Sequence, residues 1–397
     1  MIIRHLIKCK TCGHSHTLRI QVGHEPYQEH TFQCVECEEE IIVGMHCNQA
    51  TASVQIKEVQ NCSIGSKEGT IINLSPEFPI LKKDLHRDHV FPSLQHTQKI
   101  FEMQRKLGIE TPKISSFEEF QELALKLKGF NALWPIVKKG WSLTIKGKLE
   151  LAAEILKQYR EGQYKEPHEL QFVLFDFCCR MLLPLKYHLF EDAADHCRNI
   201  TENYINEFHR FRSFFKLKMA AENLDRYFDT FQEFFSCFSD FSQTLMHIQY
   251  GIKLPPDFVA SSHAFSKTKL FYGNAFETLT SNVAVLACLN NIGSGREYDQ
   301  FVEMDLKKYL TINKANRCNP FKDTAQFQKI CACLDSTVRN ASHHGGMQLV
   351  EKGKIIQYRS GGSGLLRIMS YLSYLNQCNE IMMSCCALLA LELIIAF

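Results

Sequence analysis

The sequence predicts a mostly helical fold with a small β domain at the N-terminus. From about residue 93 onward, apolar residues recur at three- and four-residue steps, which is the spacing of one face of a helix. The first 75 residues instead contain short β-prone runs, such as residues 17–22 and 41–45. A length of 397 residues suggests two or three domains, each with its own core.

Composition is that of an ordinary soluble globular protein, with 45% hydrophobic and 22% charged residues. The net charge of +2 gives no overall attraction for phosphate, so a nucleic-acid site would need basic groups gathered locally. The 17 cysteines lack regular spacing beyond residue 50, which is typical of a reducing cytoplasm. The N-terminal MIIRHLIKCKTC is too charged for a signal peptide, and we therefore expect a cytoplasmic protein.

Proline-containing breaks and changes of periodicity divide the chain into four segments. The expected segments are a cysteine-rich sheet at 1–50, a β-rich extension and linker at 51–92, a helical middle domain at 93–253 and a C-terminal helical domain at 254–397.

Helical periodicity places ten helices beyond residue 93. They are expected near 95–107, 116–129, 146–160, 169–188, 190–217, 218–249, 264–291, 297–311, 323–343 and 373–396. The helix at 218–249 carries a phenylalanine stripe that favours bundle packing over an aromatic binding surface, with a dimer seam as a further alternative. A β-hairpin is expected at 348–358, around a glycine turn.

The apolar run at 381–397 is the one candidate membrane segment. It is slightly shorter than the roughly 20 residues that a spanning helix needs, it contains Glu392, and it lacks flanking basic residues. We therefore expect a buried helix and no membrane partner.

Two C-x-x-C pairs in the first segment predict a zinc site. The four cysteines are Cys9, Cys12, Cys34 and Cys37. Two such pairs complete a tetrahedral shell with no open position, so the zinc is expected to be structural. Other possible ligands nearby are His14, His16, His24, His30, His46 and Cys47. One of them could replace a cysteine or hold a second ion, but solvated histidines are the simpler interpretation.

This pattern resembles the zinc-ribbon family over residues 5–47. Zinc ribbons bind nucleic acid or protein, so the resemblance indicates the metal without choosing the ligand. The acidic run formed by Glu36, Glu38, Glu39 and Glu40 disfavours phosphate on that side.

A second group of polar residues stands at the end of the helix expected at 323–343, with Asp323 as its N-cap. Its apolar face is expected to be Phe327, Ile330, Cys331, Leu334, Val338 and Ala341. Arg339, Asn340 and Ser342 would then point away from the core, and Gly345-Gly346 would end the helix. The helix dipole favours basic residues in the last turn of a helix. This explains the position of the arginine and the histidines but not why an asparagine directly follows the arginine.

Helical geometry separates the two histidines of this group. Arg339 and His343 are four residues apart and share a face, whereas His344 is rotated by about 140° from Arg339. If His344 acts with Arg339, the helix is expected to open before Gly345.

The sequence Arg339-Asn340-Ala341-Ser342-His343-His344 resembles the motif of HEPN-domain ribonucleases. The order of elements in 254–397 is also similar, with the motif at the end of a late helix, then a hairpin and one more hydrophobic helix. The resemblance implies that Arg339 and His344 are catalytic, that Asn340 fills the polar second position, and that His343 is the alternative histidine.

The family resemblance further implies a metal-independent endoribonuclease that cleaves RNA at a site shared by two chains of a homodimer. It implies a role as a toxin or antiviral-defence effector, with a protein or nucleic-acid trigger acting through the zinc ribbon. Arg19 and His24 have a similar spacing but lie in a β-prone run, and we assign them no role.

Two other interpretations stay open. The C-terminal domain would be a non-catalytic HEPN-type module that binds nucleotide, RNA or protein, or the chain would be a zinc-ribbon transcription factor with a helical regulatory domain. The glycine-rich loop at 359–364 is expected to be flexible and to offer RNA contacts rather than a nucleotide site, because it has no P-loop lysine.

Overall fold

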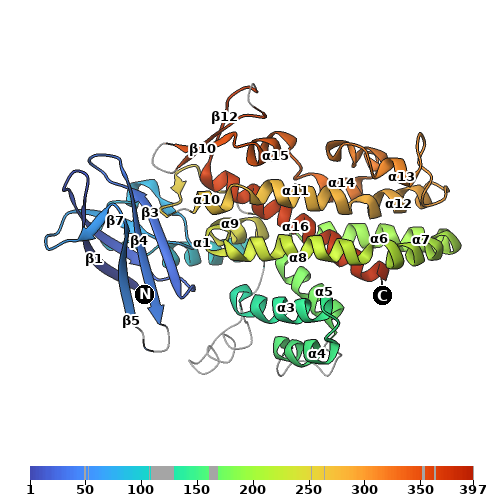
Figure 1. Cartoon of the computed structure of the whole chain (residues 1–397), viewed down its shortest axis with the longest axis horizontal. Coiled ribbons are helices and arrows are strands. Elements are labelled where there is room, and N and C mark those ends of the chain that lie inside the picture. The colour runs from blue at the N-terminus through green and yellow to red at the C-terminus, as the bar shows by residue number, and fades with distance from the viewer. Residues whose placement is uncertain are drawn as a thin grey trace. The chain divides into compact units, whose positions relative to one another are not determined.

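A computed structural model of the chain describes residues 1–48, 51, 53–106, 108, 129–160, 169–251, 253–262, 264–350, 354–361 and 364–396. The helix expected at 116–129 lies outside these residues except for residue 129. The described chain is mostly helical, as predicted, and carries several small sheets (Figure 1).

The chain forms two compact units that each draw on three stretches of sequence. The first contains Met1–Lys113, Cys237–Leu270 and Thr337–Asn379, and the second contains Ile114–Ser236, Phe271–Ser336 and Glu380–Phe397. Neither unit coincides with a segment expected from the sequence, because both helical segments contribute to both units.

A β domain opens the first unit. Its strands are β1 (Ile2–Cys9), β2 (Ser15–Gln21), β3 (Tyr27–Gln33), β4 (Glu40–Asn48), β5 (Ser53–Gln60), β6 (Cys62–Ile64) and β7 (Thr70–Leu74). One sheet has the order β6-β1-β2-β7, and the other has the order β3-β4-β5. β2 and β7 are parallel, while the other neighbours are antiparallel.

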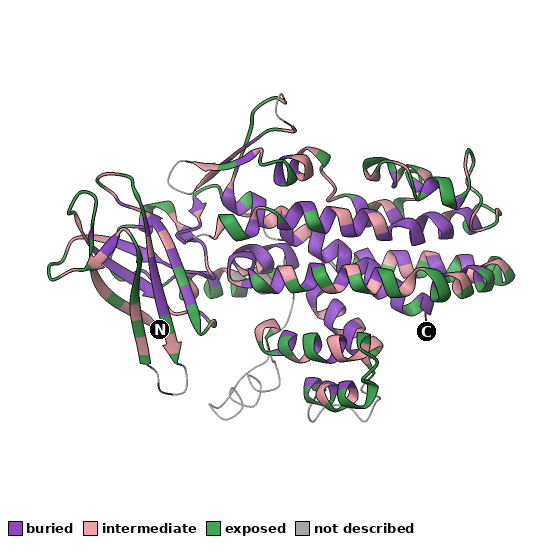
Figure 2. Cartoon of the chain, viewed as in Figure 1, coloured by how far each residue is buried: buried purple, intermediate pink, exposed green. Residues whose placement is uncertain are grey.

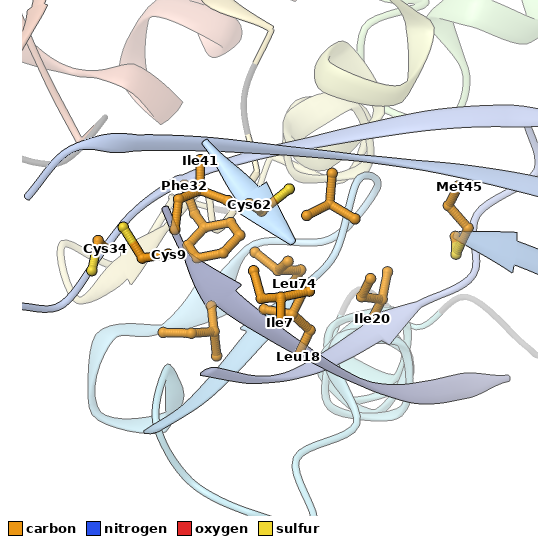
Figure 3. Close-up of a cluster of buried hydrophobic side chains, with 12 residues drawn as sticks. Ile7, Cys9, Leu18, Ile20, Phe32, Cys34, Ile41, Met45, Cys62 and Leu74 are labelled. Carbon is orange, nitrogen blue, oxygen red and sulfur yellow. The ribbon is translucent and has the colours of Figure 1, made fainter. Parts of the chain in front are cut away.

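Both sheets contribute side chains to one apolar core (Figure 3). Ile7 and Leu18 come from the first sheet and Ile41 and Val43 from the second, and all four are at most 1% exposed. β5, β6 and β7 pair with strands that precede residue 50. The expected boundary at residue 50 is therefore wrong, since pairing across it buries surface that neither segment could bury alone.

The rest of the first unit is helical apart from two small sheets. Its elements are β8 (Ile80–Leu81), η1 (Lys82–Asp84), α1 (Pro92–Lys106), α9 (Phe238–Gln249), β9 (Phe258–Val259), α10 (Phe265–Thr268), α15 (Ser336–His343), β10 (Met347–Val350), β11 (Ile355–Tyr358), β12 (Arg367–Ser370) and the Tyr371–Asn379 part of α16 (Tyr371–Ala396). The predicted hairpin is confirmed as β10 and β11, and β12 adds a third strand that we did not expect.

The second unit is a helical assembly with an aromatic core. Its elements are α3 (Phe130–Ile145), α4 (Leu149–Lys157), η2 (Gln158–Arg160), α5 (Leu170–Leu182), α6 (His188–Asn203), α7 (Ile205–Lys218), α8 (Ala220–Ser236), α11 (Phe271–Asn282), α12 (Ala284–Gly293), α13 (Leu306–Tyr309), η3 (Lys314–Asn316), η4 (Asn319–Phe321), α14 (Ala325–Cys331) and the remainder of α16. Phe235 stacks on Trp134 with ring centroids 4.7 Å apart, and Phe231 contacts the same tryptophan. The phenylalanines on α8 are thus core residues, as bundle packing requires.

Several predicted helices are shorter than expected. The 218–249 helix breaks at Cys237 into α8 and α9, only α13 forms within 297–311, and α3 was not predicted. The 323–343 helix is wrong as one element, because it ends at Cys331 and α15 begins at Ser336. In the break, the Tyr272 hydroxyl donates to the Cys333 carbonyl at 2.7 Å and accepts from the Asp335 N–H at 2.8 Å. This side chain replaces two backbone bonds that a continuous helix would have made.

α16 is the one helix in the described residues that is long and apolar enough to cross a membrane. In the most apolar stretch of this helix, 89% of the residues are buried within the fold (Figure 2). The burial is that of a core helix, in agreement with the expectation for residues 381–397.

Candidate functional site

The four cysteines lie in two turns of the same construction. Cys9 ends β1 and Cys34 directly follows β3. In each turn the N–H of the first cysteine donates to the carbonyl five residues later, His14 or Glu39, at 2.9 Å. The residue four positions after that cysteine donates back to its carbonyl, from Gly13 at 2.9 Å and from Glu38 at 3.0 Å.

Both turns need a left-handed residue at this fourth position, where φ is +77° at Gly13 and +63° at Glu38. The sequence supplies glycine in only one of them. The two turns are therefore equivalent in backbone geometry, and each brings its pair of thiols to the same side.

The sulfur positions fit a tetrahedral zinc ion. The Sγ atoms of Cys9 and Cys37 are 3.7 Å apart, those of Cys12 and Cys34 are 3.6 Å apart, and all four lie within 4.8 Å of one another. A zinc ion with bonds of about 2.3 Å to four sulfurs needs them about 3.8 Å apart. Figure 3 shows Cys9 and Cys34 close together at one end of the β-domain core.

The thiols of the quartet differ in pKa. Burial raises the pKa of Cys34. A hydrogen bond from the Glu39 backbone lowers the pKa of Cys37, but burial and the neighbouring thiols together raise it to about 12. Burial raises the pKa of the Cys9 thiol, but hydrogen bonds from the backbone of Cys12 and Thr11 lower it more, to about 7. Metal ligation needs thiolates, so a thiol that ionises near neutral pH is a favourable first ligand.

Two residues outside the quartet support it, and the sequence did not identify either role. The imidazole of the fully buried His16 lies 3.3 Å from the Cys34 sulfur through Nε2. Asn61 accepts hydrogen bonds from the backbone and hydroxyl of Thr11 at 3.2 and 2.9 Å, and its amide lies 3.8 Å from the Cys9 sulfur. Such contacts orient metal ligands.

The other histidines of the β domain have separate partners or positions. His14 contacts Thr70 at 3.0 Å, His24 pairs with Glu77 at 2.9 Å, and the His46 ring lies tilted against that of Tyr27. Within the described ranges, the cysteine quartet is the only group of three or more cysteine, histidine or acidic residues close enough to hold an ion. No described group supports the second ion that we considered.

The Arg339 motif occupies the exposed end of α15. The Arg339 guanidinium donates from Nη1 to the Asn340 side-chain oxygen at 2.8 Å. The Asn340 amide in turn donates to the Ser360 hydroxyl at 3.2 Å. Asn340 therefore connects the arginine to the loop that follows β11.

The helix does not open before the second histidine. The His344 N–H still donates to the Asn340 carbonyl at 3.0 Å, and the left-handed turn comes one residue later, at Gly345, with φ +66°. Gly346 then donates to the Ala341 carbonyl at 2.9 Å, which completes a glycine cap. The expected opening is thus absent, because helical bonding continues through the His344 N–H and the cap satisfies the last carbonyls directly after α15.

The loop at 359–361 packs against this cap. The Arg359 N–H donates to the Gly346 carbonyl at 3.0 Å. A Cβ on Gly346 would lie 2.7 Å from the Arg359 carbonyl oxygen, so only glycine fits there. Arg359 and Ser360, at the start of the predicted flexible loop, thus form part of the frame around the motif.

Ser342 is also placed differently from the prediction. It is 3% exposed, and its hydroxyl donates to the Lys269 carbonyl at 2.5 Å. Tyr374 at the start of α16 donates to the same carbonyl at 2.8 Å. This shared acceptor fixes α15 to its neighbours, so Ser342 faces the interior while Arg339 and Asn340 remain half-buried and both histidines are exposed.

The same interior contains a carboxyl with an altered pKa. Burial raises the pKa of Asp240 to about 6, although hydrogen bonds from the Ala264 N–H and the Tyr371 hydroxyl oppose this shift. Tyr371 also contacts Thr268 at 3.0 Å. Asp240 thus belongs to the packing that supports α15 and does not reach the exposed motif.

The structure brings together a guanidinium, an amide and two exposed imidazoles at one helix end. Arginine binds phosphate oxygens through two donors, and histidine exchanges protons near neutral pH. The guanidinium at this helix end can bind a phosphodiester, while of the two acid–base groups His343 shares the helix face of Arg339 and His344 is rotated away from it. Comparisons of the chain with family models, with curated proteins and with solved structures gave no match.

Proposed function

We propose that the protein is a metal-independent endoribonuclease of HEPN type, with Arg339 and His344 as its catalytic pair. The observation that carries the proposal is the exposed end of α15, where Arg339 is held by Asn340 and two histidines precede a glycine cap. The three-stranded sheet β10-β11-β12 and the long apolar α16 follow in the order that the family resemblance requires.

The chemistry assigned to each residue follows its type. His344 would remove the proton from the 2'-hydroxyl or protonate the leaving 5'-oxygen. Arg339 would stabilise the negative charge that develops on the phosphorus oxygens. Asn340 would hold the guanidinium at a fixed angle to α15 through its contact with Ser360.

Since helical bonding continues through His344, Arg339 and His344 of one chain stay about 140° apart around α15. A site that uses both residues would be completed by a second chain, which supports the homodimer implied by the resemblance. We further propose that the chain acts in the cytoplasm as a toxin or antiviral-defence effector, and that the zinc-bearing β domain responds to a protein or nucleic-acid trigger.

The test measures cleavage of single-stranded RNA by the zinc-loaded full chain in EDTA, with zinc content checked afterwards. We expect cleavage to be lost in Arg339→Ala and His344→Ala. His343→Ala should retain it, and His209→Ala, at an exposed histidine on α7, is the matched control. Equal cleavage by wild type and His344→Ala would overturn the assignment of that residue.

Helical bonding that continues through His344 favours a second candidate function, a non-catalytic module that binds RNA or nucleotide. In this function Arg339 and Asn340 hold phosphate, and the histidines need not approach the arginine. RNA binding that depends on Arg339, without any cleavage over a long incubation, would support this function and exclude the nuclease.

A further inference from the structure

The second unit contains a partly open pocket, called the cavity below, of about 200 Å³ between α7, α8 and α16. Its lining is mostly apolar, and two ionisable side chains, Lys216 and Glu392, complete it. The apolar lining consists of Phe215, Ala220, Leu224, Leu389, Leu393 and Ala396.

Glu392 is the buried group of this cavity. It is 3% exposed. One carboxyl oxygen accepts from the Tyr227 hydroxyl and the other from the Asn223 amide, both at 3.0 Å. Asn223 is held by Arg226, whose guanidinium donates to its side-chain oxygen at 2.9 Å. The carboxyl is therefore fixed in position, with further lone pairs beyond these two bonds.

Glu392 accepts these two hydrogen bonds, but no cation in the described residues forms an ion pair with its carboxyl group. Burial raises its pKa to about 8, although the bonds from Asn223 and Tyr227 and the charge of Arg226 oppose the shift. Arg226 itself is paired with Glu222. The remaining ionisable groups facing this carboxyl are Tyr227 on α8, Cys385 on α16 and, across the cavity, Lys216 on α7.

We propose that this cavity binds a small organic ammonium ion with an apolar body, the ammonium on Glu392 and the body among the leucines. A bound ammonium would supply the paired cation that the ionised form of this buried carboxyl lacks. Lys216 is exposed and screened by water, so its charge opposes such a ligand only weakly.

The volume of the cavity limits how large the apolar body of the ligand can be. A dry protein cavity of about 150 Å³ binds benzene. A cavity of about 200 Å³ therefore suits a single aromatic ring with a two-carbon arm, and phenethylammonium is the probe of choice. Its neutral isostere, 2-phenylethanol, has the same body without the charge.

The experiment titrates the full chain with both probes by isothermal calorimetry at pH 6, 7 and 8. Phenethylammonium should bind at least about tenfold more tightly than 2-phenylethanol at pH 8, where the carboxylate is available. Its affinity should rise by up to about tenfold per pH unit from pH 6, because binding must expel the carboxyl proton. The alcohol should show no such rise.

Two variants separate charge from shape. Glu392→Gln should lose the preference for the amine, and Leu224→Phe should weaken both probes by filling the cavity. Glu380→Gln, on the same helix but paired with Lys186, is the matched control and should bind as wild type does. Absence of amine binding in folded wild type, or an unchanged amine preference in Glu392→Gln, would overturn the proposal. The ligand site is independent of the proposed nuclease, so RNA cleavage does not enter this test.

Discussion

The side-chain amide of Asn340 on α15 donates a hydrogen bond to the hydroxyl of Ser360 at 3.2 Å, across twenty residues of sequence. The same asparagine accepts from Arg339 at 2.8 Å. One amide thus aligns the candidate catalytic arginine with the loop after β11, and this alignment makes Asn340 more than a polar surface residue.

Replacing Asn340 with alanine should lower RNA cleavage by about 10- to 100-fold, since Arg339 would lose the group that orients it. Ser360→Ala should give a smaller loss in the same direction, and the two changes should not be additive. Asn203→Ala, on α6, is the control and should leave cleavage unchanged. Additive losses would show that the Asn340–Ser360 contact does not position the arginine.

The two cysteine-bearing turns should respond in opposite ways when alanine replaces Gly13 in one and glycine replaces Glu38 in the other. Gly13→Ala should cost about 1–2 kcal/mol, because φ is +77° there and alanine is strained in that region. Glu38→Gly should be neutral or stabilising, since it removes the same strain at φ +63°. Zinc release during urea unfolding measures both, and a stabilising Gly13→Ala would contradict the equivalence of the turns.

Asn61 should strengthen zinc binding without being a ligand. Asn61→Ala should weaken zinc affinity by about 10- to 100-fold in competition with a chelator, because Thr11 and the Cys9 sulfur lose their bonding partner. The exposed neighbour Gln60 is the control position, and its alanine variant should bind zinc normally. Cys34→Ser should lose far more affinity than either. Equal affinities for Asn61→Ala and wild type would remove Asn61 from the support of the site.

Asp240 should make the first unit less stable as pH rises. Its pKa is about 6 in the fold against an ordinary value of 3.8, so the folded state holds the extra proton between these values. Its contribution to the free energy of unfolding therefore falls as pH rises from about 4 to about 6, by up to about 3 kcal/mol.

Asp240→Asn should flatten this part of the profile and leave the bonds intact. Both donors, the Ala264 N–H and the Tyr371 hydroxyl, reach the same oxygen, which asparagine retains. Chemical unfolding at pH 4, 5, 6 and 7 gives the comparison. If the difference between variant and wild type does not grow between pH 4 and 6, Asp240 does not titrate as described.

Sequence patterns predicted the features that depend on local spacing. The cysteine pairs were identified because two thiols three positions apart can turn toward one ion, and the C-terminal part of α16 was identified because Glu392 is the one charged residue in 381–397. The hairpin of β10 and β11 followed from the glycine between two β-prone runs.

Features created by distant partners were not predictable in this way. Asn61 reaches the first turn because β6 pairs with β1, and the buried Ser342 hydroxyl has a hydrogen-bond acceptor because the Lys269 carbonyl lies next to it. The break before α15 depends on the Tyr272 hydroxyl, which lies more than fifty residues earlier. Periodicity alone had joined α14 and α15, since their apolar residues keep the same helical step.

The most direct measurement of the central claim is the chemistry of RNA ends after incubation with the full chain in EDTA, determined by mass spectrometry. The proposed Arg339 and His344 site predicts 2',3'-cyclic phosphate and 5'-hydroxyl ends with wild type and His343→Ala, and intact RNA with His344→Ala. Intact RNA in every reaction with wild type, or 3'-hydroxyl ends that appear only when a divalent metal is added, would contradict it.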